Sequence, residues 1–157
     1  MSNTTIYLRL KSLIRVLAAL CCLVASVEAW SIEQVFNVNG VAMRGYDPVA
    51  YFTEQRPVLG SPDITHQWMD VTWQFDNISN RDKFAEDPER YAPQYGGYCA
   101  YAVSKGSTAP TDPAAWTVID DKLYLNVSKS VRSLWLPNAR SHIETANENW
   151  PRLKAGR

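Results

Sequence analysis

The sequence predicts an α+β fold, and three observations point to it. Runs rich in β-branched and aromatic residues alternate with short segments that begin at helix-capping residues. Their order has no regular βαβ rhythm, which would indicate a parallel sheet. Without an N-terminal leader of 29 residues, the remaining 128 residues suffice for one domain with a hydrophobic core. We therefore expect a small single domain in which short antiparallel hairpins pack against several short helices.

Residues 1–29 have the pattern of a secretory signal peptide. Three basic residues precede an apolar run over residues 16–27, and a cleavage site before Trp30 would have Val27 at −3 and Ala29 at −1. The run is shorter than the roughly 20 residues that span a membrane. We predict cleavage, a domain over residues 30–157, no integral membrane segment after cleavage, and export to the periplasm or the extracellular space. An uncleaved N-terminal anchor is the alternative.

The charge of the remaining chain excludes one class of partner. Removing the leader takes away three basic residues and one acidic residue, which leaves 13 basic and 15 acidic residues. Nucleic-acid binding requires a basic surface. With a net charge of about −2 on the mature chain, we expect no nucleic-acid partner.

The first half of the domain should begin with a hairpin over residues 35–43. An Asn-Gly dipeptide at its centre adopts positive φ at low cost and is the strongest short hairpin signal. Asp47 and Pro48 then predict a short helix over residues 49–52. An Asp side chain can accept hydrogen bonds from the first-turn amides, and proline fits the first helical position.

Two strands and a helix follow. Residues 64–69 and 71–75 are rich in strand-forming residues, but no favourable turn pair fixes their register. Ser79 and Asp82 have the spacing of a capping box, so we expect the helix to begin at Ser79. Pro88 cannot continue this helix without losing a hydrogen bond. A break is therefore expected immediately before it, followed by a further short turn.

The second half should contain a hairpin and three helices. Residues 115–119 and 122–127 predict the hairpin, and their alternation predicts one buried face. Ser128 is a suitable N-cap for the helix after it, and Pro151 is expected to end the last helix. The predicted helices cover residues 129–136, 138–150 and 98–103, although residues 98–103 are also compatible with a strand.

Cys99 is the only cysteine outside the leader, so it cannot form an internal disulfide in the mature chain. The leading hypothesis is a thiolate ligand for a soft transition-metal ion, copper or zinc. His66, on the strand over residues 64–69, is a second metal ligand if the fold brings it to Cys99. A buried, inert Cys99 is the alternative, because free cysteine often behaves as a small apolar residue. A nucleophilic thiol and a disulfide with another chain are further hypotheses.

Tyrosines recur around Cys99 at intervals of three or four residues. In a continuous helix this spacing indicates one core-facing stripe. A Gly-Gly pair interrupts the segment, which favours a shaped pocket for a small ligand. Asp47 could hold a ligand or could simply cap its helix. The candidate pocket residues are Tyr46, Asp47, Tyr95, Tyr98 and Tyr101.

The sequence gives no support for an enzyme. A catalytic site needs a nucleophile, a base within reach and a group that orients the base. We find no such set, no phosphate-binding glycine loop, no paired-cysteine redox motif and no His-Glu metalloprotease helix. These observations favour a binding or structural role.

Several sequence words resemble the secreted YHS-domain proteins. They are GYDPVAYF at 45–52, NRDKF at 80–84, PERYAPQYGGYCA at 88–100, AWTV at 115–118 and KLYLN at 122–126. The resemblance covers roughly residues 40–151 and implies metal binding, since YHS domains occur in some copper-transporting ATPases and some phenol-hydroxylase-type oxygenases. The metal-handling relatives use several cysteines, whereas this chain has Cys99 alone.

Overall fold

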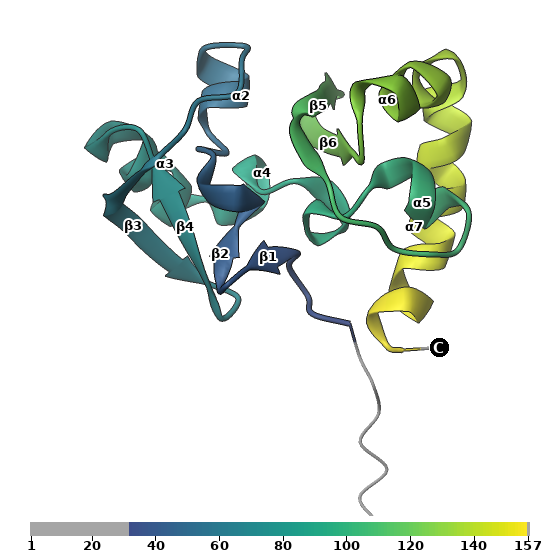
Figure 1. Ribbon diagram of the computed structural model, residues 1–157, viewed down its shortest axis with the longest axis horizontal. Coiled ribbons are helices and arrows are strands. Elements are labelled where there is room, and N and C mark those ends of the chain that lie inside the picture. The colour runs from purple at the N-terminus through teal and green to yellow at the C-terminus, as the bar shows by residue number, and fades with distance from the viewer. Residues whose placement is uncertain (1–31, 157) are drawn as a thin grey trace, which may run out of the picture. The chain divides into compact units, whose positions relative to one another are not determined.

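The computed structural model describes residues 32–156, which belong to one compact unit spanning residues 31–157 (Figure 1). The predicted signal peptide lies outside the described residues. The α+β class is confirmed, because a four-stranded sheet and a two-stranded hairpin pack with several short helices and one long helix. Within residues 32–156, none of the helices combines the length and the apolar character needed to cross a bilayer.

The four-stranded sheet has the order β1-β2-β4-β3. Its strands are β1 Asn37–Val38, β2 Val41–Ala42, β3 Ser61–Trp68 and β4 Val71–Phe75. The β1–β2 and β3–β4 pairs are antiparallel, whereas β2 and β4 pair in parallel. The predicted hairpin at residues 35–43 and the two strands after it are thereby confirmed.

Each antiparallel hairpin closes on two residues with positive φ, the geometry that matches the right-handed twist of the strands. The turn pairs are Asn39-Gly40, Met69-Asp70 and Asp120-Asp121. The first contains the predicted glycine. The second resolves the register that the sequence left open, because Trp68 pairs directly with Val71 across it.

Three short helices belong to this half of the unit: α2 Ala50–Thr53 lies between β2 and β3 in the chain, and α3 Ile78–Glu86 and α4 Pro88–Tyr91 follow β4. The predicted start of α3 at Ser79 is wrong. Asn77 is the N-cap, and its side-chain oxygen accepts a hydrogen bond from the Asn80 amide at 2.9 Å. The predicted break before Pro88 is confirmed, since Asp87 caps α4.

The second half of the unit surrounds the hairpin of β5 Asp112–Ile119 and β6 Lys122–Asn126. Its helices are α5 Ala100–Ser104, α6 Lys129–Trp135 and α7 Ala139–Lys154, with 3₁₀ turns at Gln94–Gly97 (η2) and Leu136–Asn138 (η3). Figure 1 shows these three helices on one side of the hairpin. Ser128 caps α6 as predicted, because its hydroxyl accepts from the Val131 amide at 3.2 Å.

Pro151 does not end the last helix, and that prediction is wrong. Helix α7 continues through Pro151 to Lys154. A proline inside a helix removes one backbone hydrogen bond and costs about 3 kcal/mol. Continuation brings Leu153 against a buried cluster that also contains Tyr95 and Trp135, and this apolar contact offsets part of the cost.

Two hydrophobic clusters form the core, and β6 contributes to both. Leu123 and Leu125 belong to the cluster beside the four-stranded sheet. Tyr124 belongs to the cluster under α5, α6 and α7. The predicted single buried face is therefore wrong, because successive residues of β6 are buried on opposite sides. Val127, expected inside, is 40% exposed.

Candidate functional site

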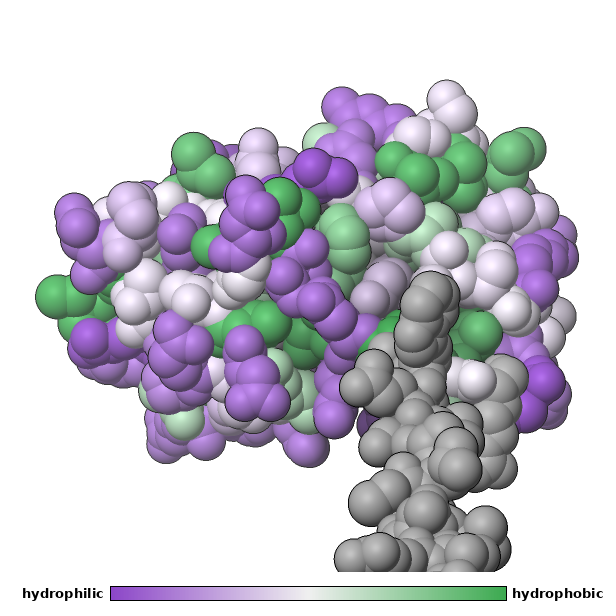
Figure 2. Space-filling view, turned by 60° about the horizontal axis from the view of Figure 1, so that its bottom comes forward, coloured by the Kyte–Doolittle hydropathy of each residue, from purple (hydrophilic) through white to green (hydrophobic). Residues whose placement is uncertain are grey.

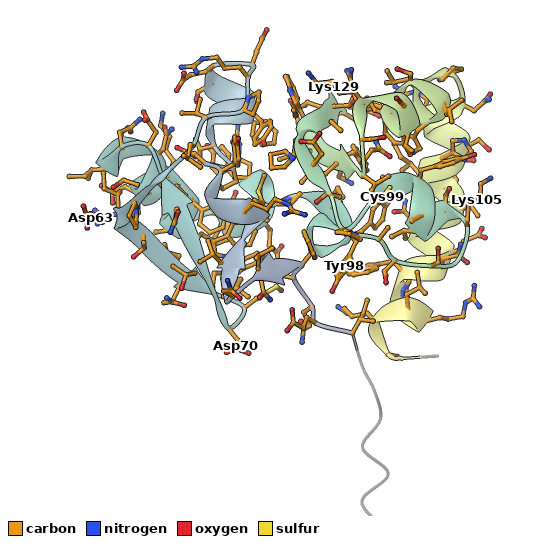
Figure 3. The ribbon with its side chains drawn as sticks, in the orientation of Figure 1. Asp63, Asp70, Tyr98, Cys99, Lys105 and Lys129 are labelled. Atoms are coloured by element: carbon orange, nitrogen blue, oxygen red, sulfur yellow. The ribbon has the colours of Figure 1, made fainter. Side chains whose placement is uncertain are left out.

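Cys99 lies in the interior at the N-cap of α5 (Figure 3). The residue is 1% exposed. Its amide donates to the Ala109 carbonyl at 3.0 Å, and its Sγ lies 3.6 Å from Asn126 Oδ1. Asn126 Oδ1 also accepts from the Tyr101 amide at 3.3 Å. The thiol therefore donates to an amide oxygen that helps to fix the start of α5.

His66 has a different environment from Cys99. It faces Trp73 across the β3–β4 pair, and its ring lies 6.0 Å from the Phe84 ring at a steep angle. The half-buried imidazole thus packs on the cluster beside the four-stranded sheet. Within residues 32–156, no group of three or more His, Cys, Asp and Glu side chains is arranged to hold a metal ion.

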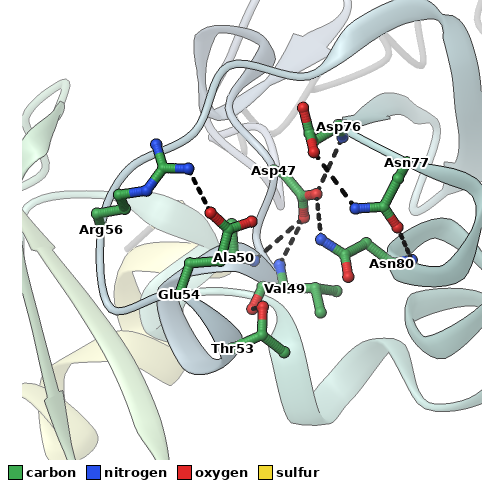
Figure 4. Close-up of polar contacts among 9 residues, drawn as sticks. All are labelled: Asp47, Val49, Ala50, Thr53, Glu54, Arg56, Asp76, Asn77 and Asn80. Carbon is green, nitrogen blue, oxygen red and sulfur yellow. Dashed lines mark hydrogen bonds and ion pairs between the residues drawn. The ribbon is translucent and has the colours of Figure 1, made fainter.

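Asp47 is fully buried, and its carboxylate accepts four hydrogen bonds (Figure 4). Oδ1 accepts from the amides of Val49 and Ala50 at 2.8 and 3.3 Å. Oδ2 accepts from the Asp76 amide at 3.0 Å and from Asn80 Nδ2 at 2.7 Å. The carboxylate therefore joins α2, the end of β4 and α3, and its hydrogen-bonding capacity is used within the protein.

Tyr46 has different contacts from its neighbour Asp47. It forms an isolated antiparallel bridge with Leu59. Its half-buried side chain lines a hollow of about 360 Å³ that also contains Arg44 and Asp112. The lining of this hollow includes none of the other four candidate pocket residues.

Tyr95 is held in place by helix α7. Its hydroxyl lies 3.0 Å from Asn147 Oδ1 and 3.3 Å from the Ile143 carbonyl, either of which it can donate to. Burial, with a smaller contribution from Tyr124, raises the pKa of the Tyr95 phenol well above its usual range. The residue has a φ of 57°, a left-handed conformation that costs a non-glycine residue about 1–2 kcal/mol.

The other two tyrosines of the segment also contact α7 but diverge along it. Tyr98 packs between Phe36 and Trp150, with ring centroids 5.6 and 6.0 Å away. Tyr101 packs against His142 at 5.0 Å. The tyrosines therefore anchor the segment to one helix, with only Tyr95 placed at a large pocket.

The Gly-Gly pair has a steric explanation. Gly96 has a φ of 58°, and a Cβ atom there would lie 2.0 Å from the Gln34 carbonyl oxygen. The Gly96 carbonyl accepts from the Phe36 amide at 2.8 Å. The segment at residues 34–36 thus crosses directly over Gly96, which leaves no space for a side chain.

A concavity with an aromatic wall lies next to this crossing. It has a volume of about 410 Å³. Its wall includes the aromatic residues Trp68, Trp73, Tyr95 and Trp150, and its charged residues are Glu89, Lys122 and Lys154. Tyr95 is the only one of the predicted candidates in this lining. No local signal in the sequence links Trp68 to Trp150, because β3 and α7 contribute to the same pocket only in the folded chain.

Comparison of the chain with family models, curated proteins and solved structures finds no match. The resemblance to YHS-domain proteins stays a prediction. A function must therefore be argued from the geometry of the aromatic pocket and from the surroundings of Cys99.

Proposed function

We propose that this protein is an exported, non-catalytic binding module of the YHS type that takes up a small ligand in the aromatic pocket. The observation that carries the proposal is the convergence of Trp68, Tyr95 and Trp150 on a concavity of about 410 Å³. Small-molecule sites are concave, of roughly 300–1,000 Å³, and lined by aromatic side chains with a few polar groups. The pocket meets each of these criteria.

The position of the pocket supports a preformed site. Tyr95 is hydrogen-bonded to α7, and its ring packs 6.0 Å from the Trp150 ring. The indole of Trp73 donates to the Trp68 carbonyl at 3.1 Å. These contacts hold the aromatic groups of Trp73, Tyr95 and Trp150 in place before any ligand arrives, which lowers the entropy cost of binding.

In this proposal Cys99 is a core residue. Its burial and the hydrogen bond that its thiol donates to Asn126 Oδ1 support that role. A closed copper or zinc site needs several soft or imidazole ligands. Binding of copper or zinc through Cys99, with His66 as a second ligand, is the competing proposal and rests on the YHS resemblance.

Ligand uptake is tested by screening small aromatic and aliphatic fragments against the full chain. Binding is detected by NMR as shifts of the tryptophan indole N–H resonances. Binding in the pocket should shift the signals of Trp68 and Trp150 more than that of Trp135, which does not line the pocket. Gln94→Trp should block these shifts by filling the pocket. Glu144→Trp, on an exposed part of α7, is the control and should preserve them. Fragments that bind equally well to Gln94→Trp would refute the pocket.

The role of Cys99 is tested by thiol chemistry and metal titration. We expect a thiol reagent to modify Cys99 only after denaturation, because the side chain is buried. Copper(I) and zinc titrations should give the same affinity for the wild type and for Cys99→Ser. Rapid reaction of the native protein, or loss of metal affinity in the variant, would favour the metal proposal.

A further inference from the structure

We infer that the ligand of the aromatic pocket is a small amphipathic anion, an apolar ring or chain that carries one carboxylate. This inference rests on the proposed function and specifies its ligand class. The inference comes from the charged residues that line the pocket together with the aromatic residues. It predicts a negatively charged ligand, whereas a metal ion is positively charged.

Two lysines and one glutamate contribute to the pocket lining. Lys122 begins β6 and Lys154 ends α7, so two separate elements bring positive charge to the same concavity. Both lysines are exposed, and within residues 32–156 neither is paired with an acidic side chain. Each ammonium group is thus available to a bound carboxylate.

Glu89 provides the opposing charge. It lies in the first turn of α4, is exposed, and also lines the pocket. Aromatic faces by themselves attract cations, and a pocket lined by rings and carboxylates would suit an amine. Here lysines outnumber the glutamate two to one. The net positive lining disfavours a cationic ligand and favours an anionic one.

The aromatic wall determines the remainder of the ligand. Trp68 and Trp150 are half-buried and Tyr95 is buried, so their rings offer apolar surface without being fully covered by protein. A planar or aliphatic group can pack on these rings. Its carboxylate can then lie toward Lys122 and Lys154, where solvent still reaches it.

The experiment compares two probes that share a ring and differ in charge. (1-Naphthyl)acetate and 2-(1-naphthyl)ethylamine are titrated into the full chain by calorimetry at low salt. We expect the anion to bind about 10-fold more tightly, with an affinity that falls as salt is added. Glu89→Gln should strengthen binding of the anion and make its affinity fall more steeply with added salt, because the net positive charge of the lining increases.

Variants that remove lysine charges test whether Lys122 and Lys154 cause the preference for the anionic probe. Lys122→Gln combined with Lys154→Gln should weaken binding of (1-naphthyl)acetate about 5-fold, as expected for two partly solvated ion pairs. Lys83→Gln combined with Lys129→Gln removes the same charge at exposed positions outside the pocket lining. This control should bind the probe as the wild type does.

The outcomes distinguish failure of the anion inference from failure of the small-ligand pocket. Equal affinity for both probes, tighter binding of the amine, or equal losses in the two double variants would overturn the anion inference while leaving a small-ligand pocket. Failure of both probes to bind would overturn the anion inference, and a fragment screen with no indole shifts would overturn the pocket itself.

Discussion

Asp47 illustrates how a single residue can resemble a site residue and yet have a structural role. The sequence places it before a proline at a helix start, which predicts a cap. The structure adds Asp76 and Asn80, which follow much later in the chain, as donors to its second oxygen. Hydrogen bonds to a charged group contribute about 1.5–3 kcal/mol each. The buried carboxylate thus stabilises the junction of three elements.

Asp47→Asn should lower the free energy of unfolding by about 2–3 kcal/mol. The new amide oxygen can accept from Val49 and Ala50, but the new NH₂ group then faces two donors, the Asp76 amide and Asn80 Nδ2. Urea denaturation measures the change. Asp63→Asn, at an exposed position on β3, is the control and should change stability by less than about 0.5 kcal/mol.

At the scale of elements, short-range chemistry fixed most helix and strand boundaries. An Asn-Gly turn, Ser128 as a cap and the break at Pro88 each depend on residues within a few positions, and each prediction is confirmed. The start of α3 differs because Asn77 and Ser79 are both good caps. With Asn77 as the cap, Asn80 lies inside the helix and donates to Asp47.

Gly96→Ala tests the backbone crossing beside the pocket. The added methyl would lie 2.0 Å from the Gln34 carbonyl oxygen, so the segment at residues 34–36 must move. We expect a loss of about 3 kcal/mol in unfolding free energy and altered resonances for Val35 and Phe36. Urea denaturation and amide spectra provide the measurements.

Gly106→Ala is the matched control for this variant. Gly106 also has positive φ, at 77°, but no atom lies within 4 Å of its added Cβ. Its substitution should cost only about 1 kcal/mol, the penalty of the left-handed conformation. Equal losses for the two variants would show that the crossing at Gly96 contributes no steric constraint.

At the scale of the whole molecule, β6 joins two hydrophobic clusters. Leu123 and Leu125 pack on one side, and Tyr124 packs on the other. Hydrophilic side chains cover most of the face shown in Figure 2, with hydrophobic residues in small groups between them. Much of the apolar surface is therefore used internally, and the stability of the unit depends on aromatic residues buried in both clusters.

Alkaline pH should destabilise the protein through these buried phenols. Burial is the largest cause that raises the pKa of Tyr51 and Tyr95, and neighbouring tyrosines and carboxylates add to it. In the unfolded chain a phenol ionises near pH 10. The free energy of unfolding is unaffected by ionisation of these phenols below that pH. It falls as the pH rises above that value, because the unfolded state then releases protons that the folded state retains.

Denaturation midpoints between pH 8 and pH 11 measure this loss. Each phenol that stays protonated in the fold contributes up to about 1.4 kcal/mol per pH unit above its unfolded pKa. Tyr95→Phe should reduce the loss of unfolding free energy per pH unit by the contribution of about one phenol. It should also lower stability at neutral pH by about 1 kcal/mol, because the hydrogen bond of the hydroxyl is lost. A slope identical to that of the wild type would contradict the prediction.

The sequence by itself determined the α+β class and most local boundaries, since caps, turn pairs and proline act over a few residues. It also named five candidate pocket residues, of which only Tyr95 lines the aromatic pocket, and it singled out the Gly-Gly pair. Only the tertiary structure decided that both sides of β6 are buried, that Cys99 and His66 have separate surroundings, and that Trp68, Trp150 and two lysines share one pocket. These features depend on contacts between segments far apart in the chain, which local spacing does not encode.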